Sequence, residues 1–137
     1  MLYDDQNIFA RIIRNELPAI KVYEDEQVLA FMDIMPQAEG HTLVIPKTPA
    51  MTLLDLPPDA AAYTIQIVQK IAQAMKTALD VQGIVLMQLS GASAGQTVPH
   101  VHFHLIPSSV HELGKHALHM GDQEKIKALA EKIKAEL

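Results

Sequence analysis

The chain of 137 residues contains no cysteine, which excludes both disulfide bonds and zinc sites built on cysteine. Basic residues are also few, since 11 Lys and Arg stand against 16 Asp and Glu and give a net charge of −5. This balance argues against a nucleic-acid-binding protein, which would carry a basic face. It still allows a local positive pocket for a small phosphate ligand.

Long apolar runs are missing as well, and no stretch approaches the length of a membrane span. The first residues, Met1-Leu2-Tyr3-Asp4-Asp5, have neither the basic region nor the apolar region of a signal peptide. We therefore expect a cytoplasmic protein with no membrane partner and no nucleic acid partner. About half of the residues are apolar, which is enough for one core, and no boundary divides the chain. The sequence predicts a single domain over 1–137.

The segment 100–105 reads His100-Val101-His102-Phe103-His104-Leu105 and alternates imidazoles with apolar side chains. Successive side chains of a strand point to opposite faces, so the apolar three can pack into a core while the imidazoles face one pocket. Histidine is the side chain whose ordinary pKa, about 6.5, lies closest to neutrality. Three of them on one face indicate a metal site, a catalytic site or an anion-binding site.

The rest of the chain predicts an α+β fold. We expect a helix over 7–17 that is ended by Leu17-Pro18, followed by strands over 20–24, 28–32 and 41–45. A long helix then runs from Pro57-Pro58 to a cap at Gly83. Strands over 84–89 and 98–106 follow, and Asp122 caps a last helix. Short connections between strands favour an antiparallel sheet of about five strands, with the long helix packed on it and the first helix at the N-terminus. The long helix carries an apolar stripe of Ile65, Val68, Ala72, Met75 and Leu79, and the last helix turns Ile126, Leu129, Ala130 and Ile133 inward.

Three interpretations of the histidine row compete. Three neutral imidazoles with a water molecule form a catalytic zinc site. Histidines hydrogen-bonded inside a core are structural. An imidazole is also a good nucleophile toward phosphorus, and an imidazolium is an acid and an anion partner, so neighbouring histidines can divide the work of phosphoryl transfer.

The loop before the row favours phosphoryl transfer. Residues 92–97 read Ala92-Ser93-Ala94-Gly95-Gln96-Thr97. Small residues let backbone amides approach a ligand closely, and successive N–H groups can form an anion-binding nest. The Thr97 hydroxyl adds a donor.

The run from Gly95 to Pro107 resembles the signature of the histidine triad (HIT) superfamily. The resemblance continues in Asn7-Ile8-Phe9-Ala10-Arg11-Ile12-Ile13, in Leu29-Ala30-Phe31-Met32-Asp33-Ile34, in Gly40-His41 and in Val44-Ile45-Pro46-Lys47. It covers a core of about 5–107 and leaves a helical tail over 108–137. Within the superfamily the chain is most similar to the Hint branch of homodimeric nucleoside phosphoramidases, which act on purine nucleotides without a cofactor.

The resemblance implies a role for each candidate residue. His102 is the nucleophile, and His104 contacts the phosphate and assists the leaving group. His100 orients His102, and His41 supports the cluster. Asp33 takes the ribose hydroxyls. The remaining implied nucleotide contacts are an apolar base pocket of Ile8, Phe9, Phe31, Ile34 and Leu43, and a phosphate-binding set of Leu89, Ser90, Gly95, Gln96 and Thr97. His111, His116 and His119 are read as surface residues.

Two positions depart from the family pattern. Relatives that bind structural zinc carry a Cys-x-x-Cys pair where this chain has Asn7 and Ala10, so we expect no metal. Leu89 stands where Hint-like proteins have Asn and fragile-histidine-triad-like proteins have Gln. Leucine cannot donate to a phosphate, so Ser90 or a backbone amide replaces that contact, or phosphate binding is weaker.

The expected function is hydrolysis or transfer at the α-phosphate of an AMP-like purine nucleotide through a nucleotidyl-His102 intermediate, with an adenosine 5′-phosphoramidate as the substrate. The alternatives are a dinucleoside polyphosphate hydrolase, a nucleotide-binding scaffold with weak catalysis, and a metal-dependent hydrolase. The resemblance also predicts a homodimer, and apolar Ile67 and Ile71 outside the main stripe of the long helix support it weakly.

Overall fold

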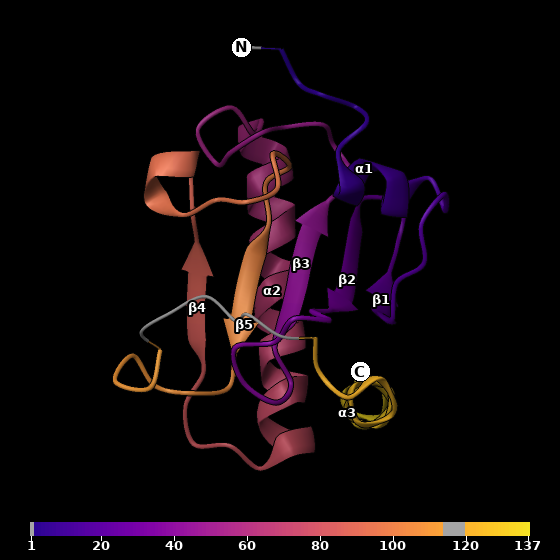
Figure 1. The fold of residues 1–137 in the computed structure, drawn as a ribbon, viewed down its shortest axis with the longest axis vertical. Helices are drawn as coiled ribbons and strands as arrows, with labels where there is room; N and C mark the ends of the chain where they lie inside the picture. Colours follow the sequence, from indigo (N-terminus) through magenta and orange to yellow (C-terminus); the bar gives the residue numbers. More distant parts are fainter. Residues whose placement is uncertain (1, 114–119) are drawn as a thin grey trace.

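The computed structural model describes residues 2–113 and 120–137 and has the element order that the sequence predicts (Figure 1). The elements are α1 (Ile8–Ile13), β1 (Lys21–Glu24), β2 (Val28–Met32), β3 (Thr42–Pro46), α2 (Pro58–Leu79), β4 (Val85–Gln88), the short 3-10 helix η1 (Ala92–Ala94), β5 (Phe103–Ile106) and α3 (Gln123–Ala135). No helix in the described ranges is long and apolar enough to cross a bilayer.

The five strands form one antiparallel sheet in the order β1-β2-β3-β5-β4, which confirms the predicted α+β class. The central strands β2 and β3 are buried along their whole length, so both faces of the sheet are covered. On one face Val28, Ala30 and Val44 join the main core beneath α2. On the other face the alternate residues of the same strands, such as Phe31 and Leu43, pack against α1.

This division explains the alternation in the histidine segment. Val101, Phe103 and Leu105 belong to the core beneath α2, as predicted. The residues between them therefore turn toward the α1 face. The segment is less regular than a single strand over 98–106, because β5 begins only at Phe103 and the Val101 N–H donates to the carbonyl of Ala50 instead.

The buried face of α2 differs from the predicted stripe. Ile67 and Ile71 are 7% and 0% exposed, whereas Ile65 is 43% exposed. Val68 and Met75 are buried, as predicted. Two overlapping stripes of this helix satisfy a three-four spacing, and contact with both the sheet and α3 shifts the buried face toward the one that contains Ile67 and Ile71. Ile67 and Ile71 are core residues, so the support that they lent to a homodimer is withdrawn.

Two helices end earlier than predicted. α1 stops at Ile13, four residues before the predicted end at Leu17, and Asn15 adopts a left-handed conformation with φ of 62°. α2 stops at Leu79, and Asp80 with φ of 50° takes the place assigned to Gly83. Asn and Asp are the non-glycine residues that enter this conformation most easily, because their short polar side chains bond locally.

The tail forms α3 as predicted. The Asp122 side chain accepts hydrogen bonds from the N–H groups of Glu124 and Lys125 and caps the helix. Ile126, Ala130 and Ile133 are buried, and half-buried Leu129 packs on the same core. α3 lies against α2 and β1 (Figure 1). His111 is exposed, and the predictions for His116 and His119 lie outside the described residues.

Candidate active site

A pocket of about 450 Å³ opens on the α1 face of the sheet, between α1, β2, β3, the loop after β2 and the end of the loop before β5. His102 and His104 form part of its wall. Leu43 of β3 pairs with His104 of β5, so backbone pairing places an apolar residue beside this histidine. Eight further predicted site residues line the same pocket: Ile8, Phe9, Phe31, Asp33, Ile34, Leu43, Gly95 and Thr97.

His102 is held by its own backbone and by an aromatic ring. Its Nδ1 atom lies 2.7 Å from the carbonyl oxygen of His100, which can only accept, so Nδ1 carries the proton. The Nε2 atom of the neutral ring therefore holds the lone pair. The Phe9 ring packs edge-on at 4.9 Å between centroids. Burial lowers the pKa of His102, which keeps the ring neutral and nucleophilic.

His104 takes the opposite tautomer through His41. The N–H of Gln37 donates to Nδ1 of His41 over 3.1 Å, so the proton of neutral His41 lies on Nε2. That Nε2 atom lies 2.9 Å from Nδ1 of His104 and donates to it. His104 then carries its own proton on Nε2. Burial lowers the pKa of His41 to about 4, with a smaller contribution from His102, and keeps this relay neutral.

His100 does not join its two neighbours in the pocket. Its Nε2 donates to the carbonyl of Pro46 over 2.8 Å, and its Nδ1 accepts from the hydroxyl of Tyr3 over 2.5 Å. The ring is fully buried, and this burial lowers its pKa to about 4. The three imidazoles are therefore not equivalent. His100 contacts His102 through its backbone carbonyl, while its ring connects the N-terminal segment to the end of β3.

Asp33 and a set of apolar side chains form another part of the pocket wall. One carboxylate oxygen of Asp33 accepts from the N–H of Met35 over 2.8 Å, and the other lies 3.5 Å from Nε2 of His41. Burial raises the pKa of this carboxyl group. Ile8 and Ile34 are 49% and 42% exposed. Large apolar side chains with this exposure beside a pocket suit a flat apolar ligand.

The loop before β5 is shaped by Gln96. Its side-chain oxygen accepts from the N–H of Gly91, and its amide nitrogen donates to the carbonyls of Met51 and Val98. Three bonds within the protein make Gln96 a support of the loop. The structure places Leu89, Ser90 and Gln96 outside the pocket wall, and the Ser90 hydroxyl donates to the side chain of Gln88.

Several contributors escaped the sequence analysis. The pocket wall also contains Ile12, Pro18, Ala19, Met32, Met35, Gln37 and Val98. Ile12 lies one helical turn after Ile8 and Phe9, so its spacing was a usable signal. No sequence signal marked the Tyr3 hydroxyl, because His100 lies 97 positions away in the chain. None marked the Gln37 N–H either, because it is a backbone group that every residue except proline carries.

One group of side chains in the described ranges has the spacing of a metal site: Asp33, His41 and His104 offer ligand atoms within 4.8 Å of one another. The hydrogen bonds oppose this use. A neutral imidazole that binds a metal through Nε2 carries its proton on Nδ1, and Nδ1 of His41 accepts the Gln37 N–H. A metal ion here would have to break that bond, so the group fits a metal poorly.

Comparison with known proteins agrees with this geometry. Residues 14–111 match the HIT domain. The chain belongs to the HIT family. It is 46% identical over 100 residues to an uncharacterized HIT-like protein of Methanocaldococcus jannaschii, covering 73% of this chain and 77% of the relative. It is 44% identical over 100 residues to an adenosine 5′-monophosphoramidase of Saccharomyces cerevisiae, covering 73% and 61%.

A HIT protein of known structure is similar over almost the whole chain. The crystal structure of a Hit-like protein involved in cell-cycle regulation from Bartonella henselae superimposes with a TM-score of 0.88 at 47% identity, covering 99% of this chain and 100% of that one. The HIT fold and the resemblance of the histidine segment are thus confirmed. As a HIT protein the chain falls in the class of nucleotide-binding hydrolases.

Proposed function

We propose that this HIT protein is a nucleoside phosphoramidase that hydrolyses the P–N bond of an AMP-like phosphoramidate through a nucleotidyl-His102 intermediate. The observation that carries the proposal is the pair of opposite tautomers in one pocket. His102 presents a lone pair on Nε2, and His104 carries a proton on Nε2. A nucleophile and a proton donor side by side are what displacement of an amine from phosphorus requires.

The first step forms a bond between Nε2 of His102 and the α-phosphorus. The P–N bond to the leaving group breaks and its electron pair stays on the amine nitrogen, which accepts a hydrogen bond from Nε2 of His104 and takes its proton from solvent. In the second step water attacks the phosphorus, the bond to His102 breaks, and the proton that the attacking water loses returns to solvent. Splitting one displacement into two lowers each barrier.

The nucleoside end is assigned to Asp33 and the apolar wall. A carboxylate accepts two vicinal ribose hydroxyls, and the aliphatic and aromatic side chains of Ile8, Phe9 and Phe31 suit a purine ring. Thr97 and the backbone amides near Gly95 are assigned to the phosphate. The name of the yeast relative, an adenosine 5′-monophosphoramidase, supports the same substrate class.

The test is release of AMP from adenosine 5′-phosphoramidate by the wild-type chain and by His102→Ala. We expect turnover to fall by roughly 1,000-fold or more in the variant, with AMP binding by calorimetry retained. His111→Ala, at an exposed position, is the control. A His102→Ala chain that keeps most of its activity contradicts the mechanism. Faster cleavage of diadenosine polyphosphates than of the phosphoramidate contradicts the substrate class.

A homodimer and a cytoplasmic location belong to the same proposal. The edge strand β4 supports the dimer, because it has one unpaired side and its Leu86 is 49% exposed. Light scattering on the purified chain distinguishes a dimer from a monomer, and Leu86→Lys is expected to shift the balance toward the monomer.

A further inference from the structure

The loop between β2 and β3 contributes side chains to the pocket wall and also orients the histidines His41 and His104. At its start Asp33 and Ile34 line the pocket. Later in the loop the Gln37 N–H sets the tautomer of His41, which sets that of His104. The Asp33 N–H donates to the His41 carbonyl and closes the loop at its base. The position of this loop therefore determines both the nucleoside contacts and the proton relay.

The start of the C-terminal helix holds this loop from outside. The N–H of Gly121 donates to the carbonyl of Ile34 over 3.0 Å. Pro36 packs so closely on Gly121 that a β-carbon built there would lie 3.1 Å from the ring carbons of Pro36 and 3.0 Å from Cδ1 of Ile126. A β-carbon at position 121 therefore requires the Pro36 ring and the end of the Ile126 side chain to move by a few tenths of an ångström.

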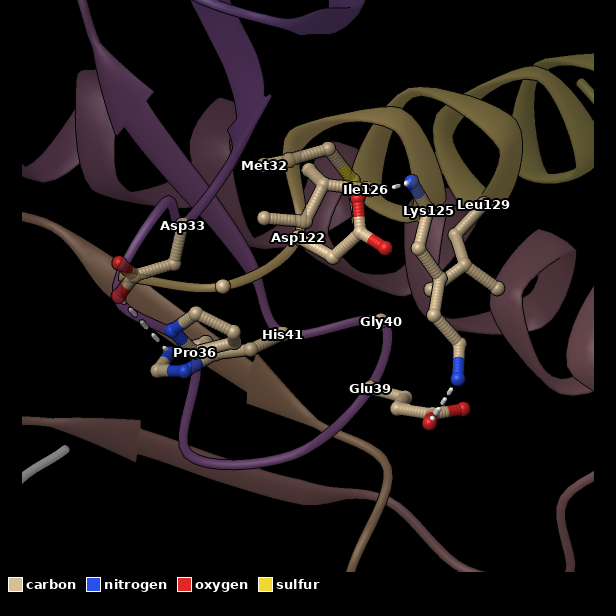
Figure 2. A pocket seen from close by; sticks show the side chains of 11 residues that line it. Met32, Asp33, Pro36, Glu39, Gly40, His41, Asp122, Lys125, Ile126 and Leu129 are labelled. Carbon is tan, nitrogen blue, oxygen red and sulfur yellow. Dashed lines mark hydrogen bonds and ion pairs between the residues drawn. The ribbon is translucent and has the colours of Figure 1, made fainter. Parts of the chain in front are cut away.

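A cavity and an ion pair also lie between the loop and α3. A cavity of about 170 Å³ separates them, with Pro36 and His41 on the loop side and Ile126 and Leu129 on the helix side (Figure 2). Across it the ammonium of Lys125 lies 2.5 Å from the carboxylate of Glu39. Both side chains are more than half exposed, and such pairs contribute little. At Gly121, by contrast, a backbone hydrogen bond and close packing on Pro36 join the loop to the start of α3.

We propose that the N-terminal end of α3 clamps the loop over 33–41, and that Gly121 is a positioning residue for the nucleoside contacts of Asp33 and Ile34. The absence of a side chain at position 121 lets Pro36 lie against it, and its N–H fixes the carbonyl of a residue in the pocket wall. This inference rests on the proposed function and extends it to a segment that carries none of the predicted site residues.

The experiment compares AMP affinity and steady-state kinetics in the wild-type chain, Gly121→Ala and Gly83→Ala. A β-carbon at Gly83 meets nothing within 4 Å, which makes it a matched control. A displacement of a few tenths of an ångström at Gly121 is expected to raise the Kd for AMP and the KM by about five- to tenfold with kcat less affected, since displacements of 1 Å cost roughly 100-fold. A role in folding alone would lower Tm and leave the Kd of the folded protein unchanged.

Two double variants distinguish displacement of the loop from displacement of α3. Gly121→Ala/Pro36→Ala removes the ring carbons on the loop and is expected to restore the Kd, whereas Gly121→Ala/Ile126→Val removes only Cδ1 on α3 and should not. If Gly121→Ala alone is too unstable to assay, the second of these carries the affinity test, because the conflict with the helix is relieved.

The outcomes separate the two proposals. Equal AMP affinity of the wild type and Gly121→Ala overturns the clamp and leaves the proposed function standing. Rescue by Ile126→Val and not by Pro36→Ala also overturns the clamp, because the strain then falls on α3. Failure of the wild type to bind AMP overturns the proposed function and the clamp with it.

Discussion

The Nε2 atom of His41 lies 2.9 Å from Nδ1 of His104, although the two residues are 63 positions apart in the chain. The Gln37 N–H on the far side of the His41 ring orients this contact. A backbone amide of the loop between β2 and β3 thereby decides which nitrogen of His104 carries a proton.

Replacement of His41 tests this relay. His41→Leu removes the donor to His104, so we expect kcat for the phosphoramidate to fall by about 10- to 100-fold with little change in AMP affinity. His41→Gln retains an N–H near the position of Nε2 and should lose less. The measurement is steady-state kinetics of both variants, and equal kcat values for the two would contradict the relay.

Stability should fall on mild acidification because of His41 and His100. The folded protein holds the pKa of each at about 4, below the ordinary value of 6.5, so the unfolded chain binds more protons between these values. The stability from these groups is present above pH 6.5 and is lost as the pH falls toward about 4, by on the order of 3 kcal/mol for each. Urea denaturation at about pH 7.5 and about pH 5 measures it. His41→Gln should reduce the pH slope, and His111→Ala should not.

Gln96 is expected to act on substrate binding through the shape of the loop. Gln96→Ala leaves the Gly91 N–H and two carbonyls without their partner, so we expect Tm to fall and KM to rise by about tenfold as Gly95 and Thr97 shift. Gln82→Ala, at an exposed position, is the control. An unchanged KM together with a lower Tm would assign Gln96 to stability alone.

Activity is expected to survive chelation. Both proposed steps use imidazoles, and the Gln37 N–H opposes a metal on His41. Dialysis against EDTA should leave kcat within about twofold of the untreated protein, since a required metal would supply several kcal/mol of transition-state stabilisation. Loss of activity on dialysis, with recovery on adding Zn²⁺, would favour the metal-dependent alternative.

Much of the fold follows from local pattern. Strand β2 occupies the range predicted for it, and the order of helices and strands is as predicted. These features depend on side-chain periodicity within a few residues, which the sequence carries directly. The buried face of α2 does not follow from local pattern, because Ile65 and Ile67 satisfy equivalent spacings. Only the neighbouring sheet and α3 decide which of the two is buried.

For the histidine row, too, some features follow from the sequence and others only from the tertiary structure. The sequence by itself determined that Val101, Phe103 and Leu105 face the core and that imidazoles alternate with them, because side chains alternate across an extended backbone. Only the tertiary structure decided the chemical state of each ring. His100 turns to Tyr3 and Pro46, His102 to a backbone carbonyl, and His104 to His41. A neutral imidazole takes its tautomer from its hydrogen-bond partners, and most of these partners are distant in the chain.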